Sequence, residues 1–236
     1  MPNPLNPENI IIGMSLRKDG NMRLSELENN AEKNRESFFI NQGIETRKVV
    51  FANLVHGSQV RVVRRSDRGK IMPAGDALIT GDLGVVLALT VADCLPVYFY
   101  DLNKKVVAIA HAGWRSLKAG VINKVIAEFL IKFDSEVQDI MIQVGPHIQA
   151  CHFEVKEDVA KEFSEYPDQI INKAGKRYIN LAGVVVEQLV KLGLKREQIK
   201  ISPDCTYCLS DKYFSYRRDR SEGLKTMLVY IGMRDK

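Results

Sequence analysis

The feature that most constrains the fold is an apolar run at residues 84–91, Gly-Val-Val-Leu-Ala-Leu-Thr-Val, which is bounded by turn-forming residues. Such a run, with no polar residue at alternate positions, predicts a β-strand that is buried on both faces. Two further strand-like runs follow, at 96–100 and 105–110, and the polar segment 101–104 separates them. This arrangement predicts a β-hairpin directly after the buried strand.

Helical periodicity and strand-like runs are mixed along the rest of the chain. The clearest helix is predicted over 116–133, where Leu117, Val121, Val125 and Phe129 recur every four residues, and Ser116 suits its N-cap. Further helices are predicted at 24–41, 155–166 and 181–192, and further strands at 9–16, 47–55, 59–64, 139–144 and 226–231. Because strict βαβ alternation is missing, we predict an α+β (layered α/β) fold with mixed sheets flanked by helices, in one domain over 1–236.

Composition and charge narrow the classes of partner. The chain is 45% hydrophobic and 27% charged, and we see neither a run of roughly 18–20 apolar residues nor a signal peptide, so we expect a cytoplasmic protein without a membrane partner. The net charge of +5 includes basic runs at 61–70 and 217–220. These runs suit solvated faces or the binding of a phosphate or anionic substrate, and no aromatic-interleaved or helix-turn-helix pattern indicates nucleic acid.

Three short stretches place metal-binding side chains at the ends of predicted strands. His56 lies between the runs 47–55 and 59–64, Cys94 follows the buried run 84–91, and His111 follows 105–110. Two imidazoles, one thiolate and a water molecule are a typical ligand set of catalytic Zn²⁺, which lowers the pKa of its water to about 7. Copper also accepts these ligands. The separations of 38 and 17 residues do not form a short metal-binding clip, so each residue alone also suits a structural role.

Residues beside the three candidate ligands suggest further roles. Asp93 is a candidate proton shuttle, or alternatively a hydrogen-bond acceptor that orients a ligand histidine. Gly113 is expected to let the backbone turn, and Trp114 suits either the core or the wall of a site for a purine base. Arg115 and the free N–H groups of a helix starting at Ser116 favour an anion such as phosphate; the alternative is that Arg115 covers a sheet edge.

The remaining cysteines form a second group. Cys205 and Cys208 make a CxxC pair, but a structural zinc site would require a second pair, and Cys94 and Cys151 are not paired in the sequence. We therefore expect a buried structural role for the CxxC pair. Cys151, which precedes His152, suits either loop packing or the lining of a substrate pocket.

The chain resembles a known bacterial family, described as multicopper polyphenol oxidases (laccase-like) or peptidoglycan editing factors. The resemblance extends from about Val49 to Ile231. The motifs that carry it are His56-Gly57, GDALIT (75–80), ADCLPV (92–97), AHAGWR (110–115), GPHIQACHFEV (145–155), DCTYC (204–208) and FSYRRD (214–219). Two positions depart from the family pattern: Leu54 stands where a glutamine is usual, and residues 222–224 read Glu-Gly-Leu where Thr-Gly-Arg is often found.

The resemblance implies a zinc-dependent purine nucleoside phosphorylase with adenosine deaminase activity. The implied substrates are phosphate with adenosine, inosine, guanosine or methylthioadenosine. The implied metal ligands are His56, Cys94 and His111. From the residues themselves we take Asp93, Cys94 and His111 as candidate catalytic residues, and Trp114, Arg115 and Cys151 as candidate substrate contacts. The implied fold is that of the catalytic domain of cytotoxic necrotizing factor toxins. The chain suits either a monomer or a dimer.

Three alternatives remain open from the sequence. A full laccase needs about ten histidines, many of them in His-x-His pairs, whereas this chain has four histidines and no such pair. The first alternative is therefore a polyphenol oxidase with a single copper at the His/Cys/His set, which is consistent with these residues. The second alternative is a metal-free cysteine hydrolase or deamidase with Cys94 as nucleophile and His111 as base. The third is a binding protein that turns over no nucleoside.

Overall fold

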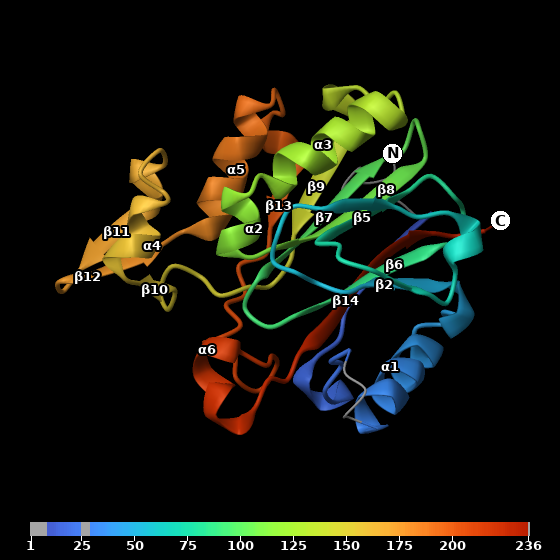
Figure 1. Cartoon of the computed structure of the whole chain (residues 1–236), viewed down its shortest axis with the longest axis horizontal. Helices are drawn as coiled ribbons and strands as arrows, with labels where there is room; N and C mark the ends of the chain where they lie inside the picture. Colours follow the sequence, from blue (N-terminus) through green and yellow to red (C-terminus); the bar gives the residue numbers. More distant parts are fainter. Residues whose placement is uncertain (1–8, 25–28, 236) are drawn as a thin grey trace.

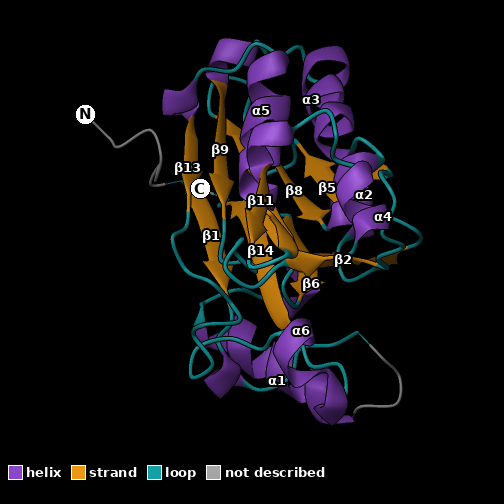
Figure 2. Cartoon of the chain, turned by 90° about the vertical axis from the view of Figure 1, so that its left-hand side faces the viewer, coloured by secondary structure: helices purple, strands orange, loops and turns teal. Residues whose placement is uncertain are grey.

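The computed structural model describes residues 9–24 and 29–235 as four layers, in which two β-sheets pack face to face between outer helices (Figures 1 and 2). The larger sheet has the strand order β13-β9-β7-β8-β5-β3, and the second sheet has the order β1-β14-β6-β2-β4. Each sheet contains parallel and antiparallel neighbours. The predicted α+β class with mixed sheets is therefore confirmed.

The elements have the following bounds. The larger sheet consists of β3 (Val60–Val62), β5 (Ala77–Thr80), β7 (Leu95–Asp101), β8 (Val106–Ala112), β9 (Ile140–Val144) and β13 (Ile199–Ile201). The second sheet consists of β1 (Ile10–Met14), β2 (Val49–Ala52), β4 (Ile71–Met72), β6 (Val86–Val91) and β14 (Met227–Met233). A small third sheet contains β10 (Glu154–Val155), β11 (Ile170–Lys173) and β12 (Lys176–Ile179). The helices are α1 (Asn29–Asn41), α2 (Trp114–Lys118), α3 (Val121–Lys132), α4 (Glu157–Lys161), α5 (Leu181–Lys191) and α6 (Tyr216–Asp219).

The predicted hairpin of β7 and β8 forms the centre of the larger sheet. Its side chains alternate between two cores: Val97 and Phe99 pack with α3 and α5, while Tyr98 and Tyr100 pack against the second sheet. The turn is closed by Asp101, whose Oδ1 accepts the N–H groups of Asn103 and Lys104. Every residue of both strands is buried, so the hairpin gives the adjoining loops a rigid base.

The outer face of the second sheet is covered by α1, as Figure 1 shows. Phe38 and Phe39 of this helix pack edge-to-face against Tyr230 of β14. The sequence predicted a helix over 24–41, and the structure begins it at Asn29. Residues 25–28 of that prediction lie outside the described part of the chain.

The prediction of a single helix over 116–133 is wrong, because the chain forms two helices there, α2 and α3. The break lies at Gly120, which has a left-handed φ of 80° and precedes α3. The four-residue periodicity continued across the break because Leu117 of α2 and Val121 of α3 pack into the same core. The N-cap is Gly113, and Ser116 is a buried residue inside α2.

The helix predicted over 155–166 is also wrong in most of its length. Only α4 is helical, because Glu154 and Val155 pair instead with β12 in the third sheet. The neighbouring hairpin of β11 and β12 turns at Ala174 and Gly175, both with positive φ. Only one of its eight strand residues is buried, so hydrophobic alternation gave no signal for these strands. In the described part of the chain, no helix combines the length and the apolar composition that a membrane crossing requires.

Candidate active site

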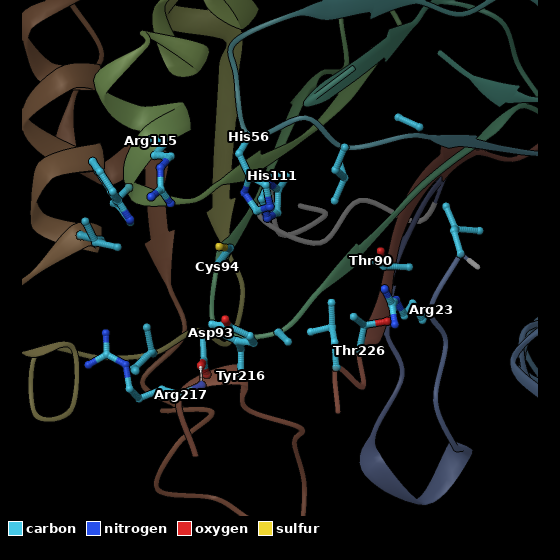
Figure 3. A pocket seen from close by; sticks show the side chains of 18 of the residues that line it. Arg23, His56, Thr90, Asp93, Cys94, His111, Arg115, Tyr216, Arg217 and Thr226 are labelled. Carbon is cyan, nitrogen blue, oxygen red and sulfur yellow. Dashed lines mark hydrogen bonds between the residues drawn. The ribbon is translucent and has the colours of Figure 1, made fainter. Parts of the chain in front are cut away.

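The structure brings His56, Cys94 and His111 together, although they are far apart in the sequence (Figure 3). His56 lies in the loop between β2 and β3, Cys94 in the turn between β6 and β7, and His111 near the end of β8. One possible ligand atom from each residue lies within 4.8 Å of the other two. The two imidazole rings are nearly perpendicular, at 69°, with 4.8 Å between their centroids. The side chains expected to hold a metal ion are therefore close enough to share one.

Two of the residues in these turns have left-handed backbone conformations, which are uncommon outside glycine. They are His56, with a φ of 56°, and Asp93, with a φ of 78°. The turn at His56 is held by buried Asp76, whose carboxylate accepts the N–H groups of Gly57 at 2.7 Å and Val55 at 3.3 Å. Strained residues of this kind often lie in functional sites, where surrounding contacts hold them in place.

The turn at Asp93 is held by the carboxylate of Asp93 itself. Its Oδ1 accepts the hydroxyl of Thr206 at 2.7 Å, and its Oδ2 accepts the hydroxyl of Ser215 at 3.0 Å and the N–H of Arg217 at 2.7 Å. Three donors thus occupy both oxygens of this buried side chain. This arrangement favours a positioning role for Asp93, which fixes the turn that carries Cys94. Asp93 also lines the cavity described below, and its role as a proton shuttle stays a prediction.

Gly113 leaves the space in which the three side chains meet. A Cβ atom at this position would lie 2.8 Å from the Sγ of Cys94, 3.6 Å from the Cε1 of His111 and 3.7 Å from the Nδ1 of His56. The backbone of Gly113 has φ −71° and ψ 167°, an extended conformation that any residue adopts. The expectation that Gly113 lets the backbone turn is therefore wrong. The glycine is needed for the room that its missing side chain leaves.

The electrostatics of the site depend on Asp76, which the sequence analysis did not assign. Burial opposes the charged form of His111, but Cys94 and Asp76 outweigh it and raise the pKa of His111 to about 9. Burial and the charge of His111 lower the pKa of His56. The Nδ1 of His111 is buried 3.9 Å from the Oδ1 of Asp76 and has no hydrogen-bond partner among the described residues. In the sequence, the feature that could have drawn attention to Asp76 is its position directly before the apolar run 77–79.

The three side chains line a cavity of about 590 Å³, within the range of about 300–1,000 Å³ typical of small-molecule sites. Trp114 and Arg115 also line it, and the Arg115 guanidinium stacks on the Trp114 ring at 4.2 Å. Figure 3 shows Arg115 on one side of the candidate ligands and Arg23, Thr90 and Thr226 on the other. Leu54 and Leu224, which depart from the family pattern, both line this cavity.

Two predicted positions differ in the structure. Cys151, a predicted substrate contact, is not among the residues that line the cavity; it lies instead beside Cys205 and Cys208. The helix predicted to start at Ser116 begins instead at Trp114, so the predicted helix start is wrong by two residues. Arg115 itself is exposed, and no carboxylate of residues 9–24 or 29–235 forms an ion pair with it.

Thr206→Val is expected to destabilise the turn that carries Cys94. The substitution removes the only donor to the Oδ1 of Asp93 that the structure shows in its described part, and this acceptor is buried. Losing a buried hydrogen bond to a charged group costs about 1.5–3 kcal/mol, which denaturant unfolding will measure. Thr206→Ser keeps the hydroxyl and serves as the control. Equal stability of the valine and serine variants would contradict the positioning role of Asp93.

The chain is similar in sequence and in structure to a family of bacterial proteins. The sequence profile of the family described as multi-copper polyphenol oxidoreductase laccase matches residues 18–234. The chain is 31% identical over 215 residues to purine nucleoside phosphorylase YlmD of Bacillus subtilis (strain 168), covering 86% of this chain and 77% of that protein. It is 30% identical over 204 residues to purine nucleoside phosphorylase YfiH of Escherichia coli (strain K12), covering 85% and 80%. The crystal structure of YlmD from Geobacillus stearothermophilus matches with a TM-score of 0.92 at 28% identity, covering 98% of this chain and 94% of that one.

Proposed function

Because the chain belongs to the multi-copper polyphenol oxidoreductase laccase family, we propose that it is a metal-dependent purine nucleoside phosphorylase. The observation that carries this proposal is the His56/Cys94/His111 set inside a cavity of suitable volume for a nucleoside. The names of the bacterial relatives support the same reaction. Although the family is described as laccases, this chain does not have the residues of a full laccase, because it has four histidines and no His-x-His pair.

The residues present fit a zinc ion better than a redox centre with several metals. Two imidazoles and one thiolate are ligands that zinc prefers, and three protein ligands leave one coordination position open. The space that Gly113 leaves beside all three side chains supports this fit. When bound, the ion supplies Lewis acidity at the open position, and copper is the alternative ion for the same ligands.

We propose that the side chains around the candidate ligands bind and orient the reactants. In phosphorolysis the bond between the purine nitrogen and the ribose C1′ breaks, a bond from C1′ to a phosphate oxygen forms, and the purine leaves with a proton. Trp114 offers an aromatic wall for the base, and Arg115 offers a positive charge for phosphate at the same end of the cavity. Adenosine, inosine, guanosine and methylthioadenosine are the proposed substrates.

The second proposed reaction is the deamination of adenosine, in which water replaces the 6-amino group and ammonia leaves. The His/Cys/His set favours it, because zinc sites in nucleobase deaminases activate a water molecule. A metal-free hydrolase with Cys94 as nucleophile remains the alternative. One possible ligand atom each of Cys94, His56 and His111 lies within 4.8 Å of the other two, and this proximity to two imidazoles favours the role of a metal ligand for Cys94.

Product analysis with and without phosphate tests the proposed function. The metal-loaded protein is incubated with adenosine, inosine, guanosine or methylthioadenosine, and the products are separated by chromatography. The expected result is release of the free purine and pentose 1-phosphate only when phosphate is present, together with inosine formation from adenosine without phosphate. Absence of purine release from all four nucleosides would overturn the proposed phosphorylase. Turnover that survives metal removal but not thiol alkylation would support the cysteine hydrolase.

Arg115→Ala is expected to weaken phosphorolysis more than deamination. The loss of one charge-assisted contact costs about 1.5–3 kcal/mol, so we expect a roughly 10- to 100-fold rise in the KM for phosphate. Lys118→Ala is the matched control, since Lys118 is a cation on the same short helix that lies near Glu162 and outside the cavity lining. Equal losses of both reactions in the Arg115 variant would show that Arg115 has only a structural role.

A further inference from the structure

A second group of metal-binding side chains lies outside the cavity. Cys151, His152, Cys205 and Cys208 come from two loops, and one possible ligand atom of each lies within 4.8 Å of all the others. None of the four lines the cavity. The sequence showed the CxxC pair but not its partners. The structure shows that the adjacent residues Cys151 and His152 supply them.

The distances within this group approach those of an ion-binding tetrahedron. With bonds of about 2.3 Å to sulfur and about 2.0 Å to nitrogen, two sulfur ligands of zinc lie about 3.8 Å apart, and a sulfur and a nitrogen about 3.5 Å apart. The Sγ of Cys151 is 3.7 Å from the Sγ atoms of both Cys205 and Cys208. The Nδ1 of His152 is 3.2 Å from Cys151 and 3.3 Å from Cys208. A small outward movement of the His152 ring would lengthen these two distances to the separation expected around a zinc ion.

The surroundings hold these side chains in place. The ring of His152 stacks on Tyr207 with 4.0 Å between ring centroids and 15° between the planes. The Sγ of Cys205 accepts the N–H of Gln149 at 3.4 Å. The sulfur separations of 3.7 Å are well beyond the roughly 2.05 Å of a disulfide bond. Three cysteines and one histidine with these supports are a ligand set of structural zinc sites.

We propose that Cys151, His152, Cys205 and Cys208 bind a second zinc ion in a closed structural site. The four protein ligands fill the tetrahedron, which leaves no position for a substrate. The ion joins the loop after β9 to the loop after β13, where Thr206 lies between two of the ligands. Because the Thr206 hydroxyl binds Asp93 next to Cys94, the second ion stabilises the turn that carries a candidate active-site ligand.

Elemental analysis of two reciprocal variants tests this proposal. We expect two zinc ions per wild-type chain, and one each in Cys94→Ala and Cys208→Ala, with the second site retained in the former and lost in the latter. X-ray absorption spectroscopy at the zinc edge of the Cys94→Ala protein is then expected to show roughly three sulfur neighbours and one nitrogen neighbour around the zinc ion. This spectrum remains informative if Cys208→Ala does not fold.

Three results would overturn the second site. One is a zinc-free Cys94→Ala protein in which Cys151, Cys205 and Cys208 react as free thiols. Another is a disulfide between any two of these cysteines in the purified wild-type protein. The third is a Cys208→Ala protein with the full zinc content of the wild type. None of these results bears on phosphorolysis, so the proposed function and the second site can fail separately.

Discussion

Cys94→Ala is expected to abolish metal binding at the His56/Cys94/His111 set and to lower purine nucleoside phosphorolysis by roughly a thousandfold. The substitution removes the one thiolate of the set and leaves two imidazoles, one of them on an exposed loop. Lewis-acid catalysis contributes several kcal/mol, and each 1.36 kcal/mol corresponds to a tenfold change in rate. Steady-state rates with inosine and phosphate, measured beside the zinc content, check this expectation.

The same variant separates two roles for Cys94. Circular dichroism of the variant serves as the folding control, because Cys94 lies in a turn that Asp93 holds through its own hydrogen bonds. If the variant kept its metal at this set while losing all turnover, Cys94 would be a nucleophile instead of a ligand. Retention of both the metal and the full rate would contradict every role assigned to this residue.

Gly113→Ala is expected to lower the zinc affinity of the same set by about 10- to 100-fold, the range found when residues that orient metal ligands are changed. The added methyl group would lie 2.8 Å from the Sγ of Cys94, which forces the sulfur away from the two imidazoles. Competition with a chelator of known affinity measures the change. Phosphorolysis at limiting zinc is expected to fall in parallel.

The conformation of Gly113 supplies the control for this substitution. Because its φ of −71° and ψ of 167° suit alanine, the free energy of unfolding of the metal-free protein should change by no more than about 1 kcal/mol, the usual effect of a changed N-cap. Zinc affinity equal to that of the wild type would show that the three side chains do not meet at this glycine.

The sequence predicted the fold where hydrophobic patterns were strong. The run at 84–91 contains β6, and the two runs after it form the buried β7–β8 hairpin. The predictions were wrong where tertiary contacts override a local pattern. Leu117 and Val121 keep a helical spacing across the break at Gly120 because they pack into one core. The β11–β12 hairpin was missed because only one of its eight strand residues is buried, which leaves no apolar alternation to recognise.

The candidate ligands of the active site could be predicted because each follows or ends a recognisable strand. The side chains that hold their turns could not. Asp93 is bound by Thr206 and Ser215, more than 100 residues later in the chain, and no local pattern reveals that pairing. The second cluster was hidden for the same reason. Its two loops meet through a bridge between His147 and Cys205, which forms only in the folded protein.

Anomalous X-ray diffraction at the zinc and copper absorption edges tests the active-site metal centre most directly. The expected result is a peak about 2.0–2.3 Å from one atom each of His56, Cys94 and His111, present above the zinc edge and absent below it. A peak that is already present between the copper and zinc edges, and that disappears only below the copper edge, would assign copper to the same ligands. Crystals of protein that is active on purine nucleosides, with no anomalous peak between these three side chains, would contradict the metal centre.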